Sequence, residues 1–268
     1  MSAILGRYSD NIVNGSTVSG TTPVSGYSLS TVLINLPSAR VRFTSTSITV
    51  TFTLTSSQEG AVFILPMHNI TPSTTGVATL TNSAGLSYAL TTGALMKNGL
   101  PAPIVADFSA SANRTSGVWN LVVAGNAANV QLGGAIGIYG PKRTFSGLQS
   151  GDLNWQYTED EETGVDIAEN EYLTEYVQDY ETSRRIVEFS GLGTVAQVQA
   201  FVDWFQANHG KALPSLFWPD PPYTGHTGDS VRAYFGRWIS GYQLSTITGL
   251  KRKASIKFRE LSRGKPIL

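Results

Sequence analysis

The chain has 268 residues, of which 41% are hydrophobic, so it can bury a sizeable core in one large domain or two ordinary ones. It contains no cysteine, which excludes disulfides and cysteine-based zinc sites, and its 19 basic and 19 acidic residues cancel, which removes the usual electrostatic argument for nucleic-acid binding. No window approaches 18 apolar residues and the first residues lack the apolar stretch of a signal peptide, so we expect neither membrane insertion nor secretion.

Charged residues are spread unevenly along the chain. Residues 1–140 carry only eight, whereas the remainder of the chain carries thirty. The eight are Arg7, Asp10, Arg40, Arg42, Glu59, Lys97, Asp107 and Arg114. The change near residue 140 predicts two units in different surroundings. We therefore predict a charge-poor domain over 1–140, an acidic and aromatic connecting segment over 141–183, and a second domain over 184–268.

The first domain is predicted to be an antiparallel β-sandwich of the jelly-roll type. Residues 47–55 alternate without a fault between hydroxyl side chains and apolar ones, which is the period of a half-buried strand. The apolar members are Ile48, Val50, Phe52 and Leu54. Similar short runs, separated by Gly, Pro, Ser and Asn, cover residues 31–36, 61–65, 104–108, 118–124 and 135–139. Many short strands between turn signals are typical of a sandwich.

The polar face of these strands consists mostly of Thr and Ser rather than Lys and Glu. One interpretation is simple β-propensity, because Thr suits a pleated surface. The other is a surface that a partner covers, because a face with few charges loses little hydration free energy when it docks. Soluble monomers normally carry far more surface charge, which favours the second interpretation for the domain as a whole.

The connecting segment is acidic, whereas the end of the chain is basic. The aromatic residues of the connecting segment are Trp155, Tyr157, Tyr172 and Tyr176, and its acids include Asp152, Glu159, Asp160, Glu161, Glu162, Asp166, Glu169, Glu171, Glu175 and Asp179. The basic residues near the C-terminus are Lys251, Arg252, Lys253, Lys257, Arg259, Arg263 and Lys265, against Glu260 only. The two segments can neutralise each other within one chain or between neighbouring copies, and the sequence leaves both possibilities open.

The second domain is predicted to be β-rich with one amphipathic helix over 194–209. Thr194 is the expected N-cap and Gly210 the expected stop, and apolar residues between them lie at spacings of three and four. These residues are Val195, Val198, Phe201, Val202 and Phe205. The expected strands of this domain cover residues 184–189, 232–238, 242–247 and 253–261.

An aromatic, Pro-rich loop is expected over 213–223, between the helix and the next strand. Phe217, Trp218 and Tyr223 from this loop, together with Trp238, are candidate residues for an interface between subunits. Trp and Tyr are enriched at interfaces, and Pro limits the entropy that a loop loses on binding. The same residues can equally close the core of the second domain, and the pattern does not choose between the two roles.

Motifs for chemistry are present only in part. Residues 191–196 match the dinucleotide fingerprint G-x-G-x-x-A, but no second strand with an acid follows the helix, so we interpret them as a tight turn and an N-cap. Residues 228–230, Gly-Asp-Ser, with His226 lack the context of a serine hydrolase and suit a turn. The other histidines, His68 and His209, are too scattered for a metal site. We predict no enzyme site, no cofactor and no metal.

The order of features over 185–262 resembles tail proteins of long-tailed bacteriophages, in particular the distal-tail and minor tail components that form rings at the tip. A strand ending at Phe189 leads into the helix; residues 210–214 open the aromatic loop with 217–220, and a strand over 233–238 precedes a final basic strand ending at Leu261. The first domain is similar to the galactose-binding or discoidin-like sandwiches often attached to such proteins, with residues 63–69 resembling their buried strand and His-Asn turn.

The resemblance implies a structural component of the virion tail that assembles in the bacterial host cytoplasm. Its expected partners are further copies of itself, in a three- or six-fold ring, and other tail proteins, with neither nucleic acid nor membrane. The alternative is a carbohydrate-binding adhesin or receptor-binding module whose sandwich recognises a host surface glycan, although the sandwich has no obvious cluster of Trp and polar loop residues to grip a sugar. A third hypothesis is a hydrolase that uses Ser230 and His226.

Overall fold

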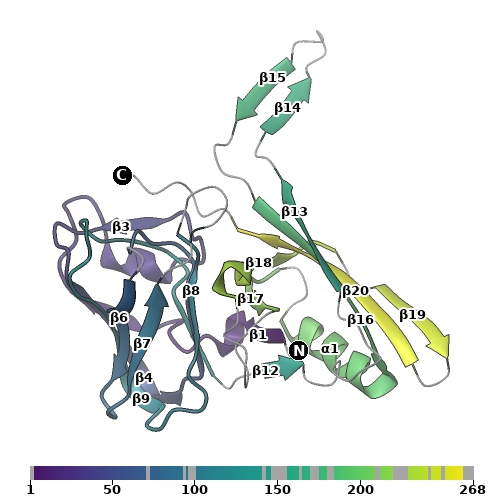
Figure 1. Cartoon of the computed structure of the whole chain (residues 1–268), viewed down its shortest axis with the longest axis horizontal. Coiled ribbons are helices and arrows are strands. Elements are labelled where there is room, and N and C mark those ends of the chain that lie inside the picture. The colour runs from purple at the N-terminus through teal and green to yellow at the C-terminus, as the bar shows by residue number, and fades with distance from the viewer. Residues whose placement is uncertain are drawn as a thin grey trace.

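The structure is a computed structural model, and it describes residues 3–70, 73–92, 95, 101–140, 143–145, 156–162, 165–169, 175–179, 184–208, 212–219, 229–240, 243–248 and 251–261. The fold is mainly β, with antiparallel strand pairs and one α-helix in these ranges (Figure 1). The predicted fold class, an antiparallel β-sandwich followed by a β-rich part with one amphipathic helix, is therefore confirmed.

The sandwich is built from a five-stranded and a three-stranded sheet, with one further strand pair. The five-stranded sheet has the order β2 (Thr17–Gly20), β4 (Ile48–Glu59), β9 (Thr115–Val123), β6 (Ser73–Asn82) and β7 (Ser87–Thr92). The three-stranded sheet has the order β11 (Gly137–Tyr139), β5 (Val62–Leu65) and β8 (Ile104–Asp107), and the separate pair is β10 (Gln131–Gly133) with β3 (Arg40–Arg42). Residues from all of these sheets meet in one apolar core.

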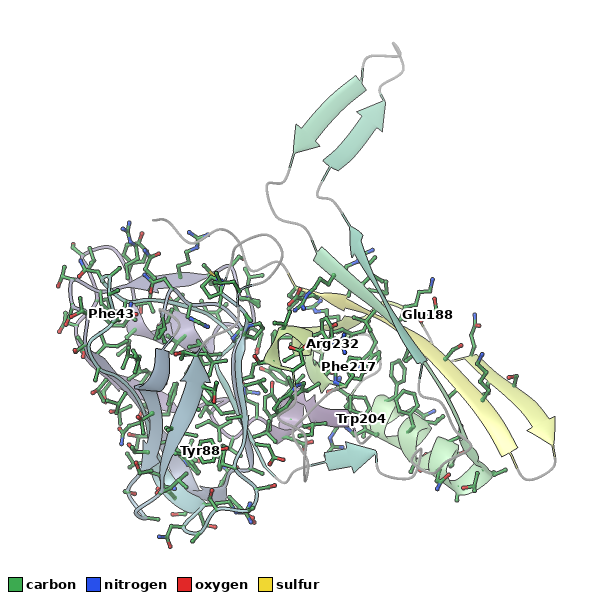
Figure 2. All side chains as sticks on the ribbon, viewed as in Figure 1. Phe43, Tyr88, Glu188, Trp204, Phe217 and Arg232 are labelled. Carbon is green, nitrogen blue, oxygen red and sulfur yellow. The ribbon has the colours of Figure 1, made fainter. Side chains whose placement is uncertain are left out.

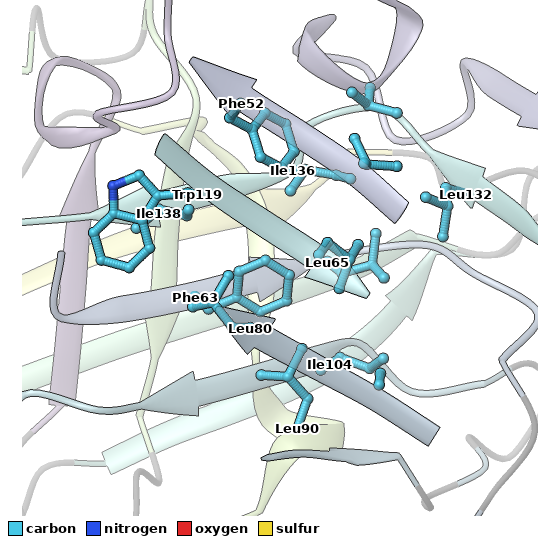
Figure 3. Packing of buried hydrophobic residues seen from close by; sticks show 14 of the residues in the cluster. Phe52, Phe63, Leu65, Leu80, Leu90, Ile104, Trp119, Leu132, Ile136 and Ile138 are labelled. Carbon is cyan, nitrogen blue, oxygen red and sulfur yellow. The ribbon is translucent and has the colours of Figure 1, made fainter. Parts of the chain in front are cut away.

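Large aromatic side chains occupy the centre of the sandwich core (Figure 3). Phe52 and Trp119 come from the five-stranded sheet and Phe63 from the three-stranded sheet, and all three are fully buried. The indole N–H of Trp119 donates to the backbone carbonyl of Ser116 at 3.2 Å, so its polar atom is satisfied inside the core. The faultless alternation seen at 47–55 thus marks a strand with one face in this core.

Most of the predicted strands of the first domain are present, but the one expected over 31–36 is wrong. That stretch begins with a 3-10 helix, Leu29–Leu33, which buries Val32 and leaves Ile34 and Leu36 51% and 45% exposed. The backbone wraps closely around Gly134, where a Cβ atom would lie 2.6 Å from the carbonyl oxygens of Ile34 and Leu36. The carbonyls of this wrap accept hydrogen bonds from the chain after β10 instead of from a neighbouring strand.

The C-terminal half forms an eight-stranded sheet to which the start of the chain also contributes. Its order is β12 (Arg143–Phe145), β1 (Ala3–Arg7), β17 (Ser215–Trp218), β18 (Tyr234–Trp238), β20 (Lys251–Glu260), β16 (Arg184–Thr194) and β13 (Gln156–Glu162), with β19 (Gln243–Thr248) also pairing with β20. β1 belongs to the charge-poor segment of the sequence, yet it lies between β12 and β17.

The expected aromatic loop over 213–223 is wrong in part, because residues 215–218 form strand β17. Prolines flank this stretch at 214 and 219, which favours a loop when only the local sequence is considered. Pairing with β1 on one side and β18 on the other supplies the backbone hydrogen bonds of a central strand. The tertiary partner, more than 200 residues away in the sequence, thus decides the local structure.

Helix α1 (Val195–Ala207) confirms the predicted helix and its N-cap. The hydroxyl of Thr194 accepts a hydrogen bond from the backbone N–H of Gln197 at 3.3 Å, and the side chain of Gln197 accepts one from the N–H of Thr194 at 2.9 Å. The helix buries its apolar stripe against β16 and β20, and this stripe includes Trp204, which the sequence pattern missed. The predicted stop, Gly210, lies outside the described residues.

The sheets and the helix are stacked as successive layers. In β17, Leu216 and Trp218 share a cluster with Val62 and Ile64 of β5, whereas Phe217 shares a cluster with the helix. The three-stranded sheet is therefore buried on both faces, between the five-stranded sheet and the eight-stranded sheet. Figure 2 shows Trp204 and Phe217 on the helix side of the eight-stranded sheet.

A separate two-stranded hairpin, β14 (Val165–Glu169) with β15 (Glu175–Asp179), stands away from these layers (Figure 1). It lies in the predicted connecting segment, between β13 and β16 of the eight-stranded sheet.

Candidate interaction surfaces

Three of the four candidate interface residues lie in the core of a single chain. Phe217, Trp218 and Trp238 are 0%, 3% and 1% exposed, and Tyr223 lies outside the described residues. The ring of Trp238 packs edge-on against Phe258, with centroids 4.8 Å apart. The indole N–H of Trp218 donates to the carbonyl of Asp229 at 3.0 Å. An interface role for these residues stays a prediction, and a direct contact of Trp218 with a second copy would require it to leave this core.

The two motifs that suggest chemistry take ordinary backbone roles where they are described. Residues 191–194 are the end of β16 and pair antiparallel with β20, so the glycines of the fingerprint lie within a strand. The carboxylate of Asp229 accepts a hydrogen bond from the N–H of Val231 at 2.9 Å and caps the short 3-10 helix Ser230–Arg232. His226 and Gly228 lie outside the described residues, so the hydrolase hypothesis stays a prediction.

The His-Asn turn after β5 is occupied by contacts within the chain. His68 is buried; one ring nitrogen accepts from the N–H of Ile70 at 3.0 Å and the other lies 2.9 Å from the carbonyl of Ala102, to which it donates. The side-chain amide of Asn69 accepts from the N–H of Gln131 and donates to the carbonyl of Asn129. The side chains of this turn thus hydrogen-bond to other segments of the sandwich.

The described part of the chain contains no group of three or more His, Asp or Glu side chains that could hold a metal ion. Within the same ranges, no helix has the length and apolar character that crossing a membrane requires.

Among the residues that the structure describes, the outer face of the five-stranded sheet carries no charge. We call this surface the Thr/Ser face. From β2 to β7, its described residues are Thr17, Ser19, Thr49, Thr51, Thr53, Val118, Asn120, Val122, Thr79, Thr81, Ser87, Ala89 and Thr91. Each is exposed or half-buried, whereas their neighbours along the strands are mostly in the core. The hydroxyl of Thr51 donates to the side chain of Asn120 at 2.8 Å, so the face has an internal hydrogen-bond pattern of its own.

The charges of the sandwich lie elsewhere. Arg40 and Arg42 are on β3, Asp107 is on β8, and Glu59 forms an ion pair of 2.5 Å with Arg114 where β4 ends and β9 begins. Lys97 lies outside the described residues. The absence of charge on the Thr/Ser face is therefore a property of that face, because the described charges of the domain lie outside it.

Where it is not covered by the sandwich, the face of the eight-stranded sheet away from the helix has the opposite character on β18 and β20. We define its basic face as Arg237 of β18 with Lys253, Lys257 and Arg259 of β20. Alternate residues of β20, such as Ile256, point into the core. Glu188 of β16 is the acidic neighbour, and its carboxylate lies 3.3 Å from the ammonium of Lys257. Glu188 is labelled in Figure 2.

A buried ion pair links the neighbouring strands β16 and β20 of this sheet. The guanidinium of Arg185 binds the carboxylate of Glu260 through two hydrogen bonds of 2.8 Å, and it donates to the carbonyls of Val231 and Ala233. It also lies 4.3 Å from the ring centre of Tyr234. The sequence pattern missed this pair, although Glu260 as the one acid in a basic strand was a signal that it has a specific partner.

A second charged cluster joins the start of the chain to the sandwich. Asp10, 8% exposed, accepts two hydrogen bonds from Arg7, at 2.9 and 2.8 Å, and this hydrogen bonding raises the pKa of Arg7. Burial raises the pKa of Tyr139 well above its usual value, and the charge of Asp10 adds to the effect. The ring of Tyr139 fills the space over Gly6 and Gly137, where a Cβ atom would lie 2.7 and 2.6 Å from ring carbons.

Comparison with models of known protein families and with curated proteins found no match to this sequence.

Proposed function

We propose that this chain is a structural component of a bacteriophage tail, at the tail tip or in the distal tail ring, where copies of it help to join the tail tube to the tip. In this role the chain performs no chemistry of its own. The support from the sequence is the order of features over 185–262, and the support from the structure is the character of its surfaces.

The Thr/Ser face is the observation that carries the proposal. Water leaves an uncharged surface at little cost in free energy, whereas each unpaired charge would oppose docking. A sheet face that spans five strands without one charge is unusual for a protein that stays a monomer in solution. Such a face suits a protein whose surface is covered in a permanent assembly.

The layered core suits the same role. A component that joins two parts of a particle must hold its own halves in a fixed relation. Here the three-stranded sheet is buried between the two larger sheets, and β1 ties the start of the chain into the C-terminal sheet. Asn208, at the end of α1, accepts a hydrogen bond from the N–H of Tyr8 at 3.1 Å and adds a polar link between the halves.

The test is incorporation into particles. Phage particles purified from a strain that carries the gene are analysed by mass spectrometry, with either the wild-type chain or the variant Thr53→Arg/Thr81→Arg supplied. We expect the wild-type chain in the particles and a loss of the variant, because two charges on the Thr/Ser face oppose its burial. The unfolding free energy of the variant should change by less than about 0.5 kcal/mol, since both sites are on the surface.

The matched control places the same charges on exposed loops of the sandwich. Ser25→Arg/Thr44→Arg changes the net charge equally and leaves the Thr/Ser face intact. Its incorporation should equal that of the wild type. Absence of the wild-type chain from the particles would overturn the proposal, and specific binding to a glycan array would favour the receptor-binding alternative.

A further inference from the structure

The β14–β15 hairpin is a sheet of its own in the part of the chain that the structure describes. It is a two-stranded sheet, and no third strand pairs with it among the described residues. Figure 1 shows it projecting from the rest of the chain beyond β13. An isolated two-stranded hairpin is at best marginally stable in water, and a third strand or a packed face is needed for stability. The hairpin is therefore expected to gain its stability from another molecule.

The composition of the hairpin says what that molecule should carry. Its strands contain Asp166, Glu169, Glu175 and Asp179 and no basic residue. Glu169 and Glu175 are directly opposite each other in the strand register. Like charges at opposed positions destabilise an antiparallel pair, and a cationic partner removes that repulsion. The hairpin is therefore suited to a basic surface.

The same chain offers such a surface in the basic face. Arg237, Lys253 and Lys257 are exposed there, and the acid on β16, Glu188, already pairs with Lys257. From Lys253 to Arg259 the face extends over about 20 Å of strand, and each strand of the hairpin is about 17 Å long. The two surfaces thus match in charge and in length.

Among the described residues, no strand pairing joins the hairpin to β18 or β20, the strands of the basic face. The hairpin emerges from the end of the sheet at β13 and points away from it, whereas the basic face lies on β18 and β20 (Figure 1). β16 separates the acidic strand β13 from β20 by two strand spacings, about 10 Å. The acidic and basic segments are therefore placed for contact between copies.

We propose that the β14–β15 hairpin of one copy docks on the basic face of a second copy. The inference rests on the homo-oligomer part of the proposed function and names its contact. Two different surfaces meet, so the contact is head to tail, and its repetition closes a ring where the rotation between copies allows it. Each hairpin then packs on a neighbouring sheet, and its acids meet the lysines and arginines of that sheet.

Charge reversal on each surface tests the contact by sedimentation. One variant is Glu169→Lys/Glu175→Lys in the hairpin and the other is Arg237→Glu/Lys253→Glu on the basic face. Each should self-associate roughly 100-fold more weakly than the wild type, because like charges then face each other. An equimolar mixture of the two should associate again, since each reversed surface meets its complement. A chain with all four substitutions should also associate. Moderate salt should weaken the wild-type contact.

Arg40→Glu/Arg42→Glu on β3 is the control, since it makes the same change in net charge away from the basic face. It should associate like the wild type. Thermal melts of all variants separate loss of contact from loss of fold. A wild-type chain that stays monomeric up to about 1 mM, or reversed variants that fail to recover on mixing, would overturn the inference. Recovery on mixing by a chain absent from phage particles would instead overturn the proposed function alone.

Discussion

The five-stranded sheet of the sandwich and the eight-stranded sheet, which lie on opposite sides of the three-stranded sheet, are both antiparallel, yet charge is distributed differently on each. The sandwich sheet has an apolar core on one face and an uncharged Thr/Ser face on the other. The eight-stranded sheet has an apolar face under helix α1, a basic face opposite, and a buried ion pair between Arg185 and Glu260. We propose that the two sheets make contacts in different ways, one through neutral surfaces and one through complementary charge.

The joint between the three-stranded sheet of the sandwich and the eight-stranded sheet is where the largest loss of stability is expected. Trp218 packs among residues of both regions, and Trp218→Ala removes a buried indole and leaves a cavity. We expect a fall of about 4 kcal/mol in the free energy of unfolding, measured by urea denaturation. Trp119→Ala, within the sandwich core, is the matched control for loss of an indole away from the joint. A Trp218→Ala monomer with unchanged stability and weakened assembly would support the interface role instead.

The buried ion pair should be the next most sensitive feature, because it is particular to the C-terminal sheet. Glu260→Ala leaves the guanidinium of Arg185 buried without its carboxylate, so the free energy of unfolding should fall by roughly 3 kcal/mol or more. Replacing both partners, as Arg185→Met/Glu260→Leu, should restore most of the loss. Glu188→Ala, at the exposed pair with Lys257, should cost less than about 1 kcal/mol. Equal losses at the two glutamates would contradict the comparison.

The smallest expected effect on stability concerns Tyr139, which is buried in the cluster between the three-stranded and eight-stranded sheets. Its raised pKa means that the fold favours the neutral phenol, so the stability it contributes is complete below the unfolded value near pH 10 and is lost as pH rises above it. At pH 11 the free energy of unfolding should be about 1.4 kcal/mol lower on this account. Tyr139→Phe should lack that part of the alkaline loss.

Tyr88→Phe serves as the comparison for this titration. Burial also raises the pKa of Tyr88, but this residue is only half-buried. Replacing Tyr88 with Phe should therefore change the alkaline loss of stability by less than replacing Tyr139. An alkaline profile that is identical in the wild type and in Tyr139→Phe would show that this residue does not titrate with unfolding.

Local periodicity was enough to predict the elements whose own residues carry a clear pattern of buried and exposed positions. The alternation at 47–55 and the apolar stripe after Thr194 correspond to β4 and α1, because each buries one face against a core. It failed where distant residues decide. At 31–36 the period-two pattern is overridden by the wrap around Gly134, and at 215–218 two neighbouring strands make a strand from a Pro-flanked stretch.

The interaction surfaces were predictable only in outline. Low charge in residues 1–140 favoured the hypothesis of a surface that a partner covers, and the strand register was needed to gather its threonines and serines on one face. Opposite charges in the hairpin and the C-terminal strand were visible in the sequence, whereas their separation within one chain follows from the order of strands. The pairing of Arg185 with Glu260 joins residues far apart in the chain, and no local pattern contains it.

The location of the chain in a phage particle tests the central claim most directly. Antibodies raised against the purified chain and labelled with gold are applied to intact particles and imaged by negative-stain electron microscopy. The account predicts label at the end of the tail, with several copies in each particle. Particles that carry no label, or label confined to the capsid, would contradict it.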